Sequence, residues 1–75
     1  MEKLMQCKVG KYRKIVMIDA VAPMQIKRRL LELGFTAGQL VKIAKKSILG
    51  ETYLLEIKGY YISMRKSLTE FVWVE

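Results

Sequence analysis

Side chains able to carry acid–base, nucleophilic or metal chemistry are scarce in this chain of 75 residues. It contains no histidine, the side chain that most often acts as an acid or base near neutral pH. Its single cysteine, Cys7, has no histidine to activate it, so we expect a buried, unreactive thiol. The acidic residues are spread out without a close pair: Glu2, Asp19, Glu32, Glu51, Glu56, Glu70 and Glu75. No glycine-rich phosphate loop is present, so the sequence predicts a protein that is not an enzyme.

The same inventory bears on metal binding. Fe(II) and similar ions favour imidazole, thiolate and carboxylate ligands, and this chain offers no imidazole and one thiol. We therefore expect no cofactor and no tight transition-metal site within one chain. A weak carboxylate site for Fe(II) or another divalent metal, or a site shared between chains, stays open.

The surface charge points to an anionic partner. Fourteen Lys and Arg residues against seven Asp and Glu residues give a formal net charge of +7. Such a surface is attracted to nucleic acid, to acidic protein faces or to the cytoplasmic leaflet of a membrane. No nucleic-acid motif accompanies the basic clusters, so we expect solvated faces that keep the domain soluble rather than a nucleic-acid footprint.

Length and composition indicate one domain that spans residues 1–75. A single unpaired cysteine is compatible with a reducing, cytoplasmic setting. No apolar run is long enough for a signal peptide or a membrane span, so we expect a cytoplasmic protein.

A helix is expected to begin at Pro23, which suits the first helical position, and to end at Gly34. Its apolar positions recur at i, i+4 and i+7: Ile26, Leu30 and Leu33. Glycine adopts the left-handed conformation that ends a helix without a Cβ penalty, and in that geometry Phe35 folds back toward Leu30.

Five short strands are predicted around this helix, at residues 11–18, 40–46, 52–57, 60–64 and 71–74. The third and fourth form a hairpin joined at Lys58–Gly59, in a register that places six side chains on one side of the sheet: Tyr53, Leu55, Ile57, Tyr60, Ile62 and Met64. The capping-box spacing of Ser67 and Glu70 predicts a single helical turn before the last strand. Together these elements describe a small, strongly bent barrel of about five strands with an inserted helix.

The ordered set of motifs resembles the family of ferrous iron transport protein A, FeoA, and the small barrel at the end of some metal-dependent repressors. The matching positions are Leu4, Lys8, Gly10, Arg29–Leu30, Gly34–Phe35, Gly38, Gly59–Tyr60, Ile62, Met64–Arg65, Val72 and Val74. The resemblance implies an SH3-like barrel and an accessory role in ferrous iron uptake. It also implies a partner, the membrane transporter FeoB with its cytosolic G domain, and therefore a location peripheral to the inner membrane. Thr69 stands where a small Ala is expected.

On the family pattern Val72 and Val74 point inward, so Phe71 and Trp73 are expected to point outward. Exposed aromatic and apolar side chains are enriched at interaction sites. The alternative is that Trp73 covers the N-terminal segment near Met5 within its own chain. The candidate partner-contact residues combine two apolar spots with a basic rim: Ile48 and Leu49, Tyr61 and Trp73, and Lys45, Lys46 and Arg65.

Two alternative functions stay open at this stage. A small basic barrel binds nucleic acid when aromatic side chains form a stacking platform, for which Tyr53, Tyr60, Tyr61 and Trp73 are the candidates. A self-associating or metal-linked regulatory module is the second alternative, and without DNA-binding helices it would act in trans. Homo-oligomer formation is left open.

Overall fold

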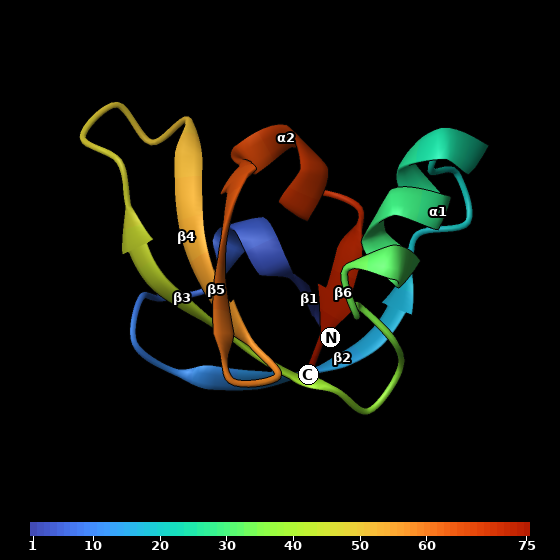
Figure 1. Ribbon diagram of the computed structural model, residues 1–75, viewed down its shortest axis with the longest axis horizontal. Coiled ribbons are helices and arrows are strands. Elements are labelled where there is room, and N and C mark those ends of the chain that lie inside the picture. The colour runs from blue at the N-terminus through green and yellow to red at the C-terminus, as the bar shows by residue number, and fades with distance from the viewer.

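One antiparallel sheet, strongly bent, forms most of the molecule in a computed structural model that describes residues 1–75 (Figure 1). The elements in chain order are β1 (Glu2–Lys3), a 3₁₀ helix (Leu4–Gln6), β2 (Tyr12–Ile18), α1 (Met24–Glu32), β3 (Leu40–Lys46), β4 (Thr52–Ile57), β5 (Tyr60–Arg65), α2 (Lys66–Thr69) and β6 (Val72–Val74). The strands lie in the order β1-β6-β2-β3-β4-β5. The predicted barrel with an inserted helix is confirmed. Its sixth strand, the two-residue β1, was not predicted.

The core lies on the concave side of the sheet, where alternate strand residues meet α1 and the 3₁₀ helix. Its fully buried side chains are Leu4, Ile15, Leu30, Phe35, Val41, Ile43, Leu55, Ile57, Thr69, Val72 and Val74. Burying each large aliphatic or aromatic side chain contributes about 2 kcal/mol. Val72 and Val74 point inward as predicted. Register shifts between Ile15 and Met17 of β2 and between Ile43 and Lys45 of β3 increase the local bend of the sheet.

The β4–β5 hairpin has the predicted register. Tyr53 pairs with Met64, Leu55 with Ile62, and Ile57 with Tyr60. Both turn residues have positive φ, +52° at Lys58 and +81° at Gly59, as in a type I′ turn. A lysine in this left-handed conformation costs about 1–2 kcal/mol, so contacts elsewhere must hold the turn in place.

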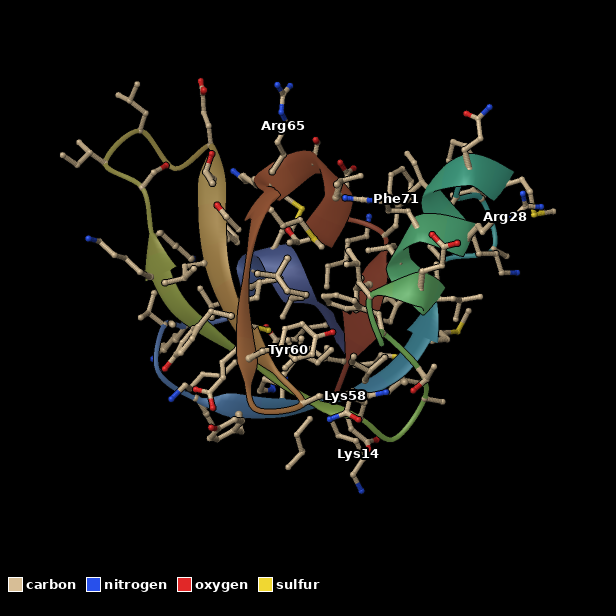
Figure 2. All side chains as sticks on the ribbon, in the orientation of Figure 1. Lys14, Arg28, Lys58, Tyr60, Arg65 and Phe71 are labelled. Atoms are coloured by element: carbon tan, nitrogen blue, oxygen red, sulfur yellow. The ribbon has the colours of Figure 1, made fainter.

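The end of α1 supplies those contacts. Gly34 has φ +101°, and the amides of Gly34 and Phe35 donate to the carbonyls of Leu31 and Leu30, both at 3.0 Å. This is the glycine-terminated ending predicted from the sequence. The stem of Lys58 lies against Gly34, with Cε 3.2 Å from the position of a Cβ at that glycine, and the Tyr60 hydroxyl donates to the Leu33 carbonyl at 2.6 Å. The hairpin is thereby docked on the helix end, and Figure 2 labels Lys58 and Tyr60 where they lie at the base of β5.

Helix starts are less well predicted than this helix end. Pro23 is the N-cap of α1 rather than its first helical residue, and its carbonyl accepts from the Lys27 amide at 2.9 Å. The capping-box prediction for α2 is wrong, because Arg65 is the N-cap and no side chain caps the helix. The Lys66 amide instead donates to the Glu51 carbonyl at 2.8 Å, a bond to another part of the chain. Thr69 is buried and its hydroxyl donates to the Lys66 carbonyl at 2.6 Å, which satisfies the polar group that an alanine would lack.

Candidate interaction surface

The β3–β4 loop projects two apolar side chains into solvent. Its base is closed by Ser47, whose amide donates to the Thr52 carbonyl at 2.8 Å and whose hydroxyl accepts from the Glu51 and Thr52 amides, both at 3.1 Å. At the tip, Ile48 is 103% exposed and Leu49 is 83% exposed. The loop is therefore held by hydrogen bonds of the backbone and of the Ser47 hydroxyl, and both aliphatic side chains remain exposed. Figure 1 shows it at one upper corner of the molecule.

Each of the two side chains borders a different shallow hollow. Ile48 lines a hollow on the outer face of the sheet with Lys45, Ser47, Thr52, Leu54 and Ser63. Leu49 lines a groove beside α2 with Met5, Gly50, Glu51, Thr52, Arg65, Lys66, Ser67 and Glu70. Arg65 lies opposite Thr52 in the hairpin and points away from the sheet at the top of Figure 2. Four predicted contact residues, Lys45, Ile48, Leu49 and Arg65, thus border the two hollows, which share Thr52, and we call them the loop-tip surface.

Lys46 is not an equivalent member of this basic rim. The register shift in β3 places Lys46 opposite Tyr53, an inward-facing residue, and Lys45 opposite Leu54 on the outer face. Lys46 is half-buried, and its Nζ lies 5.0 Å from the centroid of the Tyr53 ring. Neighbouring strand residues point to opposite faces, so only one of the two lysines can face outward, and the β-bulge, which the sequence pattern did not indicate, makes it Lys45.

Tyr61 and Trp73 do not form one face. They belong to β5 and β6, which three other strands separate in the sheet. Tyr61 is exposed as expected, whereas Trp73 is half-buried, donates from Nε1 to Asp19 Oδ2 at 3.2 Å and lies below the Lys3 ammonium at 5.5 Å. The structure therefore agrees better with the alternative in which Trp73 covers the N-terminal segment, although the residue that it contacts there is Lys3 and not Met5.

The expectation that Phe71 points outward is wrong. Phe71 is half-buried and packs against the core. Its backbone lies outside β6, and its carbonyl accepts from the Asp19 amide at 2.7 Å. Since the strand begins only at Val72, alternation within β6 does not extend back to this residue.

A polar row crosses four strands on the outer face, and the hairpin register expected from the sequence predicts only its Glu56–Tyr61 pair. Tyr12, Lys42, Glu56 and Tyr61 are paired in register from β2 to β5. The Tyr12 hydroxyl donates to Glu56 Oε2 at 2.7 Å, and Lys42 Nζ lies 3.2 Å from Glu56 Oε1 and 4.7 Å from the Tyr12 ring centroid. The hydrogen bonds from Tyr12 and then Lys42 lower the pKa of the Glu56 carboxyl, while the bond to Glu56 raises the pKa of Tyr12 and of Lys42. The register of β2 with β3 and of β3 with β4 brings Tyr12 and Lys42 to Glu56.

Cys7 is buried, in agreement with the sequence-based expectation. Arg13 Nη1 donates to its Sγ at 3.2 Å, and Arg13 Nη2 also pairs with Glu2 at 2.7 Å. Burial raises the pKa of the thiol in spite of the opposing charge of Arg13. The thiol is therefore protonated near neutral pH, and the thiolate that would attack a substrate or bind a metal is disfavoured.

No group of three or more His, Cys, Asp or Glu side chains lies close enough together to hold a metal ion. The aromatic candidates for a stacking platform are likewise dispersed: Tyr53 is buried, the Tyr60 hydroxyl is bonded to α1, and the Trp73 indole is bonded to Asp19. No helix combines the length and the hydrophobicity required to cross a bilayer.

These features define a small bent β-barrel whose exterior carries exposed apolar and basic side chains. The sequence matches the family model of the FeoA domain over residues 2–75, and the chain belongs to this family. No curated protein matches the chain.

Solved structures of this family share the fold. FeoA from Stenotrophomonas maltophilia in complex with zinc is 27% identical, with a TM-score of 0.86 over 100% of this chain and 91% of that chain. It is described as a prokaryotic SH3 domain protein and a suggested bacterial ferrous iron transport activating factor. FeoA from Chlorobium tepidum is 26% identical, with a TM-score of 0.85 over 97% of this chain and 68% of that chain. The predicted SH3-like architecture is thus confirmed.

A manganese-dependent transcriptional repressor has the same fold at 16% identity, with a TM-score of 0.87. The match covers 99% of this chain but only 35% of the repressor. This likeness concerns the fold alone.

Proposed function

We propose that this protein is an accessory subunit of ferrous iron uptake that docks through the loop-tip surface on the cytosolic part of a FeoB-type transporter. Membership of the FeoA family and the activating role suggested for the Stenotrophomonas maltophilia relative support the transport context. The observation that carries the docking proposal is the exposure of Ile48 and Leu49 at the end of a hydrogen-bonded loop. The protein would act in the cytoplasm, at the inner membrane through its partner, without catalysis of its own.

The loop-tip surface suits a partner with an apolar pocket and an acidic rim. Removing the side chains of Ile48 and Leu49 from water would contribute about 2 kcal/mol each. The structure contains two ion pairs, Arg13 with Glu2 and Lys42 with Glu56, so Lys45 and Arg65 remain available for charges on a partner. Such rim charges accelerate association more than they strengthen the final complex, and salt screens their effect.

The test is a titration of the purified protein against the transporter's cytosolic domain by isothermal calorimetry. We expect Leu49→Asp, and more strongly the double variant I48D/L49D, to weaken binding by about tenfold or more, because a carboxylate would be buried in the apolar contact. Val9→Asp is the matched control, since Val9 is also an exposed aliphatic residue in a connection and lies outside the loop-tip surface. Wild-type affinity in I48D/L49D, with an unchanged circular dichroism spectrum, would overturn the proposal.

Salt dependence separates the basic rim from the apolar tip. We expect association of the wild type to slow as ionic strength rises, and the variant K45A/R65A to show a smaller dependence. Stopped-flow association rates at low and high salt measure this directly. Equal salt dependence in the two proteins would remove the rim from the proposal and leave the tip.

A further inference from the structure

The outer face of α1 is a second exposed surface on which apolar and basic residues combine. Ile26 and Leu30 turn inward and pack against the core. At i, i+3, i+4 and i+7 on the opposite side stand four residues that line one shallow hollow together with Glu32: Met24, Lys27, Arg28 and Leu31. Met24 is 68% exposed and Leu31 is 45% exposed, and Val21 in the turn before the helix is 78% exposed. The outer side of the helix thus carries two exposed apolar residues, Met24 and Leu31, among charged ones.

We infer that this α1 face binds directly to an anionic lipid surface. An interfacial helix lies flat on a bilayer with apolar side chains in the acyl boundary and lysine or arginine ammonium and guanidinium groups among the phosphates. Val21, Met24 and Leu31 are positioned for the first role, and Lys27 and Arg28 for the second. Neither of these cations belongs to an ion pair in the structure.

The charge of the face argues against a second copy of this chain as its partner. Two α1 faces packed on each other would bring Lys27 and Arg28 of both copies together, and like charges at such a contact are destabilising. The nearby carboxylates do not neutralise the face. Glu32 is the one acidic residue that lines the hollow, against the two cations of Lys27 and Arg28, so the hollow keeps a net positive charge.

The position of α1 allows this contact without obstructing the loop-tip surface. Figure 1 shows α1 and the β3–β4 loop at opposite sides of the molecule, and Figure 2 shows Arg28 at the outer edge of α1, away from the sheet. The inference is independent of the docking proposal, since the two surfaces share no residue. Lipid binding through α1 would hold the protein at the membrane with the loop tip free.

The experiment is flotation of the purified protein with vesicles of phosphatidylcholine alone and of phosphatidylcholine mixed with phosphatidylglycerol. We expect the wild type to float with the mixed vesicles and not with phosphatidylcholine alone, because each basic residue near an anionic surface strengthens binding by about fivefold. K27E/R28E should lose flotation. M24S/L31S, which keeps the charge, should weaken it several-fold, and all four side chains are solvent-exposed, so the fold should persist.

I48S/L49S is the matched control, because it also replaces two exposed aliphatic residues with serine. It should float as the wild type does while failing to bind the transporter's cytosolic domain. The inference is overturned if the wild type ignores the mixed vesicles, if M24S/L31S floats normally, or if I48S/L49S loses flotation instead. Loss of binding to the cytosolic domain in K27E/R28E without any lipid binding by the wild type would assign the α1 face to a protein partner.

Discussion

Two turns of this protein each contain a left-handed glycine next to large apolar residues, yet they have opposite fates. At the end of α1, Gly34 precedes Phe35, which is buried in the core. In the β3–β4 loop, Gly50 follows Ile48 and Leu49, which are exposed. The first turn is covered by the β4–β5 hairpin, whereas the second is held by its own backbone, by Ser47 and by the Lys66 amide at its base, and its tip is not covered. Apolar residues at the first turn therefore stabilise the fold, and those at the second are free to bind a partner.

The largest expected difference between the turns is in the free energy of unfolding after truncation of an apolar side chain. Phe35→Ala should destabilise the protein by about 3–5 kcal/mol, because it leaves a cavity in the core. Leu49→Ala should change stability by less than about 0.5 kcal/mol, as is usual for an exposed residue. Urea denaturation followed by circular dichroism measures both values. A similar loss of unfolding free energy in the two variants would show that the two turns do not differ in this way.

Substitution of the two glycines tests the same difference between the turns. Gly34→Ala and Gly50→Ala should each cost about 1–2 kcal/mol, because alanine disfavours positive φ. At Gly34 the new Cβ would also lie 3.2 Å from Lys58 Cε, whereas nothing lies within 4 Å at Gly50. We therefore expect a larger loss for Gly34→Ala. In the background of Lys58→Ala the excess should shrink, as a double-mutant cycle would show. An unchanged excess would mean that the stem of Lys58 simply moves aside.

A smaller effect is expected from the hydrogen bond that joins the hairpin to α1. Tyr60→Phe removes the donor to the Leu33 carbonyl and should cost about 1 kcal/mol. Tyr61→Phe is the matched control, because the neighbouring tyrosine is exposed and makes no such bond to α1. Thermal unfolding of the two variants side by side measures the difference. Equal midpoints would show that the hydroxyl does not hold the hairpin on the helix.

The smallest expected effect lies outside both turns, in the row of Tyr12, Lys42 and Glu56. Because the pKa of Glu56 is lowered in the folded protein, its stabilising contribution is present above the pKa of the unfolded chain and is lost as pH falls through the folded value. Glu56→Gln should remove this contribution to the fall of the thermal unfolding midpoint at acidic pH. Thermal unfolding across acidic pH tests this, and identical slopes for variant and wild type would contradict it. Substitutions in either turn should leave this pH dependence of the unfolding midpoint unchanged.

Much of the architecture could be predicted because it depends on neighbours in the sequence. The hairpin register follows from alternation on both sides of Lys58–Gly59, and the α1 ending follows from Gly34 and the contact of Phe35 with Leu30. The exposure of Ile48 and Leu49 was also predicted, but their role in contact with a partner stays a prediction. The pairing of Tyr61 with Trp73 in one face failed, because β6 lies beside β1 and β2 and not beside the hairpin.

By itself the sequence determined the features whose signals are local: the helix α1, its ending at a left-handed glycine and the two-residue turn of the hairpin. It also determined the lack of histidine. Only the tertiary structure decided which strands lie side by side, where α2 begins, and whether Trp73 meets solvent or Asp19. The physical reason is the range of the interactions. Propensity and φ preference act within a few residues, whereas the partner of an outward-facing side chain depends on how the bent sheet brings distant strands together.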